Sequence, residues 1–287
     1  MKKNKSILVI TGIILAIIFM SFTPKKNDKK IEFDYKGIEK SVAKINDKLY
    51  VGKYEVTNLQ FREYLYYLTI NGQTEIIKNV RLDTLNWRNK NCNNEPMLEL
   101  YFRHPAYANY PVVNVSYEAA NLYCEWLTNE YNNNPKKKYK KVKFRLPTII
   151  EWEIAASGGL ENNNYPWGNN LLVDNKFMCN FNHIGDENLH YDTLTKKIVV
   201  DYKSNIGTVN SPRDNADITA PVESYYANKF GLYNMSGNVA EMIQEKGISK
   251  GGSWKNVGGD VRIKSQNHYV KSATDLGFRY FMEIVEL

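Results

Sequence analysis

Three residues of types that bind transition metals stand near one another in the middle of the chain. They are Cys179, His183 and His190, in the spacing C-x3-H-x6-H. A thiolate and two imidazoles could together hold a transition-metal ion. The spacing matches no standard zinc motif, so polar loop residues are the favoured interpretation. No Ser–His–Asp triad, phosphate-binding loop or pair of catalytic carboxylates stands out elsewhere in the sequence.

The helices that would surround such chemistry have clear start signals. Thr57 can cap a helix with Gln60 three residues later, and Thr148 with Glu151 repeats this capping box after a proline. Ser116 can cap a third helix that carries an apolar stripe. We therefore expect three helices to begin at these positions.

The remaining structure is expected to consist of short strands and long loops. β-type runs occur at residues 50–56, 111–115 and 277–284. Residues 157–260 show no sustained period and are rich in Asn, Gly and Asp, which predicts long ordered loops. Long loops in a compact domain need something to hold them, and bound metal is one candidate.

The composition is that of a globular protein, with 43% apolar and 24% charged residues among 287. Three cysteines are too few for a disulfide-stapled scaffold. Most of the net charge of +7 lies in residues 1–30, which hold seven lysines and one aspartate. The rest is close to neutral, which argues against a nucleic-acid-binding protein. A lysine cluster over residues 136–143 is interpreted as a solvated loop tip, with contact to an anionic envelope polymer as the functional alternative.

The N-terminus is typical of an export signal. Three lysines within the first five residues precede an apolar run of 16 residues, Ile7–Phe22. As a helix this run is about 24 Å long, short of the ~30 Å hydrocarbon core. We expect residues 1–23 to form a signal peptide or an uncleaved membrane anchor, residues 24–45 a lysine-rich linker, and residues 46–287 one domain. The protein would then be exported to the cell envelope, in the periplasm or anchored to the membrane; a buried helix of the fold is the alternative.

A series of short motifs runs through the chain in a fixed order. They are GKYEVTN (52–58), PVVNVS (111–116), CEW (124–126), RLPT and EWE (145–153), PWG (166–168), APV (220–222), FGLYNMSGNV (230–239), GGSW (251–254) and GFR (277–279). The ordered set resembles the formylglycine-generating enzyme family, also called the sulfatase-modifying factor domain, from about residue 46 to the C-terminus. The resemblance implies an α+β fold, a variant of the C-type lectin fold with much irregular loop structure that is stabilised by calcium.

Two calcium sites are implied by the resemblance. The first would use the side chains of Asn180 and Asp214 with the main-chain carbonyls of Phe181 and Ala216. The second would use the side chains of Asn234 and Glu241 with the carbonyls of Gly237 and Val239. Calcium takes such mixtures of carboxylate, amide and carbonyl oxygens. The alternative is that Asn234 caps a turn and Glu241 is a surface acid.

The residues that carry the family's redox chemistry are replaced. The resemblance places two copper-binding cysteines shortly after the Gly-Gly-Ser motif, where this chain has Asn256 and Val261. Copper(I) needs soft sulfur ligands, so no copper is expected. The tryptophans that the family carries on either side of the calcium-binding acid are replaced by Ala240 and Met242. Formylglycine generation by the family mechanism is therefore not expected.

Cys124 lies on an apolar-rich helix and is predicted to be a buried thiol. The family position with which it could form a disulfide holds Tyr280, so no disulfide is expected there.

Two functions from different classes remain. The first is a non-catalytic, calcium-stabilised binding or scaffold component of the bacterial envelope, of the gliding-motility or secretion type. Its partner would be an envelope protein or peptide, with membrane contact through the N-terminal segment and no nucleic acid. The alternative is an oxidoreductase of the formylglycine-generating or non-haem-iron type with altered metal ligands. Fold and chemistry evolve separately, which favours the first.

Overall fold

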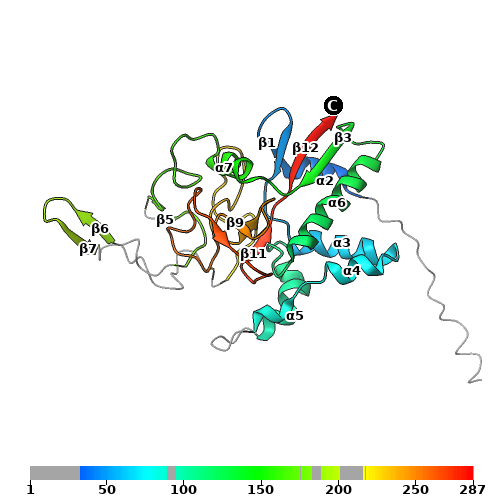
Figure 1. The fold of residues 1–287 in the computed structure, drawn as a ribbon, viewed down its shortest axis with the longest axis horizontal. Coiled ribbons are helices and arrows are strands. Elements are labelled where there is room, and N and C mark those ends of the chain that lie inside the picture. The colour runs from blue at the N-terminus through cyan, green and yellow to red at the C-terminus, as the bar shows by residue number, and fades with distance from the viewer. Residues whose placement is uncertain are drawn as a thin grey trace, which may run out of the picture. The chain divides into compact units, whose positions relative to one another are not determined.

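A computed structural model describes residues 33–88, 95–174, 176–182, 189–200, 216 and 218–286. The expected export segment, residues 1–23, lies outside the described residues, as do His183 and Asp214. Helices and strands mix with long loops (Figure 1), as the α+β prediction requires. Within the described ranges, no helix is both long and apolar enough to cross a membrane.

Six α-helices and two 3₁₀ turns lie within the described residues. The helices are α2 (Tyr35–Ser41), α3 (Asn58–Ile70), α4 (Thr74–Asn79), α5 (Glu95–Arg103), α6 (Tyr117–Asn133) and α7 (Ile149–Ser157). The 3₁₀ turns are η1 (Thr84–Trp87) and η2 (Pro105–Tyr107). The expected capping boxes are present at the starts of α3 and α7. The Ser116 hydroxyl accepts a hydrogen bond from the Ala119 N–H at the start of α6, so all three predicted helix starts are confirmed.

Two four-stranded sheets form the framework of the domain. The first has the order β1 (Val42–Lys44), β2 (Leu49–Gly52), β12 (Phe281–Glu286), β3 (Lys141–Arg145), with every neighbour antiparallel. The second has the order β10 (Asn267–His268), β9 (Ile248–Lys250), β8 (Ala240–Met242), β11 (Leu276–Phe278), in which β8 and β11 are parallel. Two separate hairpins pair β4 (Leu172–Val173) with β5 (Lys176–Phe177) and β6 (Leu189–Asp192) with β7 (Lys197–Val200).

The chain passes from the second sheet to the first through two residues. β11 ends at Phe278 and β12 begins at Phe281, so Arg279 and Tyr280 stand at the junction. In the described residues between α7 and β8, irregular segments alternate with strands of two to four residues. That stretch is the one whose Asn, Gly and Asp content predicts ordered loops.

The second half of the expected linker over residues 24–45 contains regular secondary structure. Residues 35–44 form α2 and β1, and the carboxyl oxygen of Asp34 caps α2 by accepting a hydrogen bond from the Gly37 N–H. Phe33 packs edge-to-face on Trp126 of α6, with ring centroids 5.9 Å apart. The lysine content of this stretch masked a short amphipathic helix, whose apolar residues rest on the core while its lysines stay in water.

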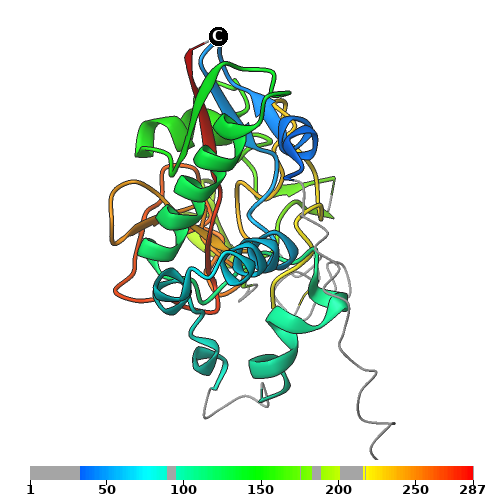
Figure 2. The same cartoon turned by 90° about the vertical axis from the view of Figure 1, so that its right-hand side faces the viewer.

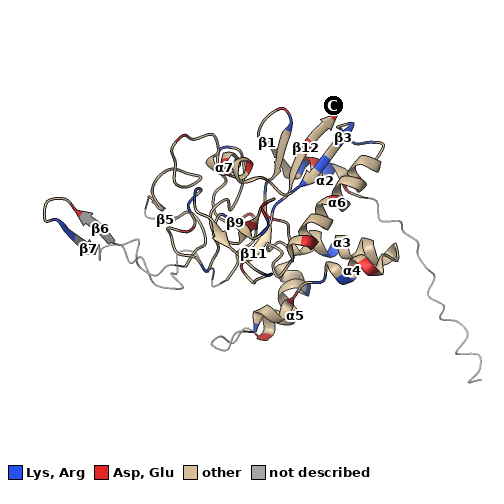
Figure 3. Ribbon diagram, in the orientation of Figure 1, with Lys and Arg blue, Asp and Glu red and all other residues tan. Residues whose placement is uncertain are grey.

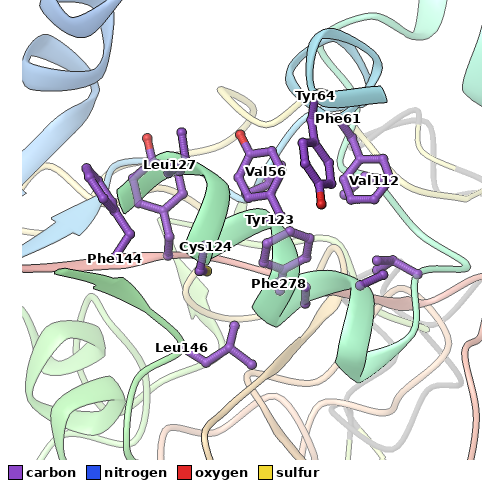
Figure 4. Close-up of a cluster of buried hydrophobic side chains, with 14 of the residues drawn as sticks. Val56, Phe61, Tyr64, Val112, Tyr123, Cys124, Leu127, Phe144, Leu146 and Phe278 are labelled. Atoms are coloured by element: carbon purple, nitrogen blue, oxygen red, sulfur yellow. The ribbon is translucent and has the colours of Figure 1, made fainter. Parts of the chain in front are cut away.

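The main core lies where α3 and α6 meet the strands (Figure 4). Tyr123 of α6 stacks on Phe61 of α3, with ring centroids 5.8 Å apart, and meets Phe278 edge-to-face at 5.5 Å. Cys124 is buried beside them and forms no disulfide, which confirms the expectation for this thiol.

Helix α6 also covers the free edge of the first sheet. It runs alongside the edge strand β3 (Figure 1, Figure 2), and its side chains bond the strand's main chain. Asn132 Nδ2 donates to the Val142 carbonyl at 2.8 Å, and Asn132 Oδ1 accepts from the Val142 N–H at 2.9 Å. Thr128 Oγ1 accepts from the Phe144 N–H at 2.9 Å. These side chains satisfy groups that an uncovered edge would offer to another strand.

Replacing Asn132 should therefore weaken the domain. Asn132→Ala leaves a main-chain N–H and a carbonyl of β3 without their partners, and we expect a loss of about 1–3 kcal/mol in the free energy of unfolding. Asn133→Ala, at the exposed neighbouring position of the same helix, should change it by less than about 0.5 kcal/mol. Urea unfolding of both variants checks this; equal losses would show that the edge bonds contribute nothing beyond helix propensity.

Candidate functional site

The second predicted calcium segment, residues 234–241, begins as a tightly coiled turn. Asn234, Gly237 and Asn238 all adopt left-handed backbone conformations, with φ of 52°, 74° and 64°. Asn and Gly tolerate this region better than other residues, which explains why the sequence places them here. The turn leads directly into β8, where Glu241 lies.

The turn brings the two predicted calcium segments together. The Asn238 N–H donates to the Asn180 carbonyl at 2.8 Å. A Cβ atom on Gly237 would lie only 2.2 Å from the same carbonyl oxygen. Close approach of the two main chains at this point therefore requires glycine.

The amide of Asn234 has one satisfied end and one free end. Its Nδ2 donates to the Val222 carbonyl at 3.1 Å and to Glu55 Oε2 at 3.3 Å. Both partners are acceptors, so the orientation of the amide is set. Asn234 Oδ1 is buried and has no hydrogen-bond partner. A buried carbonyl-type oxygen without a donor is a position at which a cation would be stabilised.

Glu55 is a second buried carboxylate beside this turn. Its side chain is 1% exposed and accepts a hydrogen bond from Asn238 Nδ2 at 2.8 Å. Asn238 Oδ1 in turn accepts from the Ala220 N–H at 2.7 Å, which ties the turn to a neighbouring loop. Burial raises the pKa of the Glu55 carboxyl to about 7. Glu55 thus orients both asparagines from a position far away in the sequence.

Glu241 is not a surface acid; it is the counterion of a buried arginine. Arg279 donates to Glu241 Oε1 from Nε at 3.0 Å and from Nη2 at 2.7 Å. Trp152 Nε1 donates to Glu241 Oε2 at 2.8 Å. Arg279, Glu241 and Trp152 are all essentially inaccessible to solvent.

The remaining donors of Arg279 bind main-chain carbonyls. Nη1 donates to Gly52 at the end of β2 at 2.9 Å, and Nη2 donates to Tyr233 at 2.7 Å. Arg279 Nη2 also lies 3.9 Å from Glu55 Oε2, so the guanidinium stands between both buried carboxylates.

Sequence reasoning placed Glu55, Trp152 and Arg279 within family motifs but assigned them no role. A usable signal was present, because Glu55 stands between Tyr54 and Val56 and Arg279 between Phe278 and Tyr280. A charged residue inside an apolar run is expected to have a buried partner. The identity of that partner is not readable from the run itself.

The first predicted calcium segment is only partly described. Asn180 is buried, and its Nδ2 donates to the Ile218 carbonyl at 2.6 Å. Phe181 is buried in an apolar cluster with Phe177. Asp214 lies outside the described residues, so the described part of the chain does not contain the complete set.

The two positions expected to replace copper ligands lie in different settings. Asn256 Oδ1 accepts from the Ser253 hydroxyl at 2.7 Å. Val261 is fully buried in an apolar cluster that also contains Cys179. Among the residues that the structure describes, no three His, Cys, Asp or Glu side chains converge in a way that could hold a metal ion. His183, of the Cys–His set, lies outside this part of the chain.

Comparison with known proteins identifies the family. The model of the sulfatase-modifying factor enzyme 1-like domain matches residues 26–284, and the chain belongs to this family. The family resemblance predicted from the motifs is confirmed.

The curated relatives include enzymes and a protein described as inactive. The formylglycine-generating enzyme of Thermomonospora curvata is 32% identical over 133 residues, which cover 46% of this chain and 32% of that protein. The enzyme of Bos taurus is 26% identical over 310 residues, covering 90% of this chain and 71% of that protein. Inactive C-alpha-formylglycine-generating enzyme 2 of Bos taurus is 27% identical over 254 residues, covering 78% and 70%. The match thus spans about a third of the Thermomonospora enzyme's length.

Solved structures support the fold. PvdO from Pseudomonas aeruginosa aligns with a TM-score of 0.51 at 18% identity, over 82% of this chain and 80% of that one. CarF aligns with a TM-score of 0.50 at 19% identity, over 82% and 86%. The predicted α+β fold of the formylglycine-generating enzyme type is confirmed.

The close contact at Gly237 gives a stability prediction. Gly237→Ala forces a methyl group against the Asn180 carbonyl in addition to its left-handed φ, and we expect a loss of at least about 3 kcal/mol. Gly72→Ala, with a similar φ of 66° and no atom within 4 Å, should lose only about 1 kcal/mol. Chemical unfolding of the two variants separates the contact from backbone strain, and equal losses would exclude the contact.

The buried ion pair gives a second prediction. Glu241→Gln leaves Arg279 without its carboxylate in a dry site, and the free energy of unfolding should fall by about 3–5 kcal/mol. Glu283→Gln removes the same charge from the partly exposed pair with Arg145, which also binds Glu151, and should cost less than about 1 kcal/mol. Thermal melting of both variants checks this; a small loss for Glu241→Gln would mean that Glu55 takes over as counterion.

Proposed function

We propose that this chain is a non-catalytic, calcium-stabilised binding or scaffold member of its family, exported to the bacterial envelope. The observation that carries the non-catalytic assignment is the pair Asn256 and Val261 at the positions of the copper cysteines. An amide already bonded to Ser253 and a buried valine offer no sulfur to Cu(I). The relative from Bos taurus that covers 78% of this chain is named an inactive formylglycine-generating enzyme, which supports a non-catalytic role.

The oxidoreductase alternative has less support. Cys179, its candidate thiol, is 2% exposed and surrounded by aromatic and aliphatic side chains. Burial of this kind is typical of an inert thiol, because reactive cysteines need an accessible and electropositive environment.

Calcium at the second site is supported by the unpaired oxygen of Asn234. The donor set would be the side chains of Asn234 and Glu241 with the carbonyls of Gly237 and Val239, all oxygen ligands that suit this ion. Glu241 would share its carboxylate with Arg279 and Trp152. Bound calcium would supply structural charge that holds the left-handed turn against β8.

We propose calcium at the first site as well. The donors would be Asn180, the Phe181 carbonyl, Asp214 and the Ala216 carbonyl. Asn180 adjoins the second site because its carbonyl accepts a hydrogen bond from the Asn238 N–H at 2.8 Å. The two ions would therefore brace one another's loops.

The proposed partner is an envelope protein or peptide, with membrane contact through the N-terminal segment. Export rests on the three lysines and the apolar run Ile7–Phe22. Affinity capture from membranes followed by mass spectrometry tests the partner class. Recovery of cytosolic proteins alone would contradict the export.

Calcium should raise the melting temperature of the purified chain. At a hundredfold excess over its dissociation constant, one ion adds about 2.7 kcal/mol of stability, which corresponds to roughly 5–10 °C in a domain of this size. Asn234→Gly keeps the left-handed backbone, removes the unpaired oxygen and should lose one equivalent of bound calcium with its share of the increment. Asn114→Gly is the matched control, because Asn114 also has a positive φ of 61° and an unpaired buried Oδ1.

The measurements are calorimetric melting with calcium or chelator and elemental analysis of the dialysed protein. Absence of bound calcium together with unchanged melting would overturn the calcium assignment. One equivalent of copper retained beside Asn256 after loading with Cu(I) would overturn the non-catalytic assignment.

A further inference from the structure

One end of the described domain carries a surface rich in unpaired lysines, here named the basic end. It comprises α2, the β1–β2 hairpin, the loop over residues 134–140 and strand β3, and lysine colour gathers around α2 and β3 in Figure 3. Its exposed lysines without an acidic partner within ion-pair distance are Lys36, Lys40, Lys48, Lys136, Lys138, Lys141 and Lys143.

The half-buried carboxylate of Glu39 joins the parts of the basic end. Glu39 Oε1 of α2 accepts from the Lys138 N–H at 2.8 Å and from the Tyr131 hydroxyl at 2.7 Å. This carboxylate holds the lysine loop against α2 and anchors both on α6. The lysines therefore belong to a surface of fixed shape rather than to a freely moving tail.

The acids at this end are already engaged. Asp47 pairs with Lys44, Glu286 with Lys140, and Glu283 with Arg145. Asp34 caps α2 through the Gly37 N–H. What remains facing solvent is an excess of positive charge.

The chain enters the domain at this same end. Phe33, the first described residue, lies two positions before the start of α2. In the sequence, residues 23–32 connect it to the apolar run Ile7–Phe22 and contribute four further lysines. Ten residues reach at most about 35 Å when fully extended. An apolar run seated in a bilayer would therefore keep the basic end close to the membrane surface.

We propose that the basic end docks on an anionic phospholipid surface. This inference rests on the proposed export for the membrane tether, which is the apolar run. The charge pattern of the basic end is independent of export, because it belongs to the described residues. Each lysine near such a surface contributes about fivefold to partitioning, and the attraction decays within about 8 Å at physiological salt. Docking would fix the orientation of the domain, with the basic end facing the bilayer. The Asn234–Glu241 region belongs to the second sheet and not to the docked surface.

The test is acylation footprinting of the full chain reconstituted into vesicles. The vesicles are phosphatidylcholine alone or phosphatidylcholine with about one phosphatidylglycerol in three lipids. Mass spectrometry should show several-fold slower acylation of the basic-end lysines on the anionic vesicles. Lys229 and Lys271, exposed elsewhere, should react equally on both. Raising the salt to about 1 M should remove the difference, because the Debye length falls to about 3 Å.

Matched variants separate docking from mere proximity. The triple variant Lys136→Gln, Lys138→Gln, Lys143→Gln should abolish the lipid-dependent protection of Lys36 and Lys40. The control Lys78→Gln, Lys229→Gln, Lys271→Gln removes equal charge elsewhere and should leave that protection intact. Both sets lie on exposed positions, so both proteins should melt like the parent chain.

Three outcomes would overturn the proposal. The first is equal acylation of the basic end on neutral and anionic vesicles. The second is equal protection of Lys229 and Lys271, and the third is full protection by soluble heparin without vesicles, which would indicate a polyanion in place of a bilayer. None of these outcomes touches the calcium assignment, which is measured by melting in the absence of lipid.

Discussion

Arg279 is a permanent cation that is buried from water, and its need for hydrogen-bond acceptors constrains the elements around it. It sits where the chain leaves β11 for β12, so its position is set by both sheets at once. Its donors reach Glu241 on β8, the end of β2 at Gly52, and the carbonyl of Tyr233. A buried guanidinium is tolerated only when its donors are paired, and the elements that supply those partners are thereby held in place.

The buried network does not depend on Asn256 and Val261, the two positions proposed to stand in place of copper ligands. Glu241 and Trp152 serve Arg279, and Glu55 orients Asn234 and Asn238; none of these contacts passes through the copper positions. Asn256 and Val261 lie in separate surroundings, one in a hydrogen-bonded turn and one in an apolar cluster. A loss of metal ligands at these two positions would therefore leave the buried network intact, as expected where one fold carries different functions.

The centre of the domain and its basic end differ in electrostatic character. At the centre, the charges of Arg279, Glu241 and Glu55 are buried and lie close to one another. At the basic end, lysines outnumber the acids that could pair with them. The carboxylate of Glu39 accepts hydrogen bonds that hold α2 to the neighbouring loop. Buried charge stabilises a particular arrangement, whereas exposed charge is left for long-range attraction. The buried charges stabilise the fold of this chain, and the exposed excess of lysines suits the proposed docking on an anionic surface.

The sequence alone determined what depends on neighbouring residues. Thr57, Ser116 and Thr148 mark helix starts because a cap bonds an N–H two or three residues away, and Cys124 is buried because its helix has an apolar stripe. At residues 35–44 the lysines hid helix α2, whose partly buried apolar side chains pack against the core. Tertiary structure decided the centre: Glu55 meets Asn234 179 positions away, and Arg279 meets Glu241 38 positions away. A charged residue inside an apolar run predicts a buried partner, because burying an unpaired charge costs much free energy. Which residue becomes that partner depends on which elements meet in the folded chain.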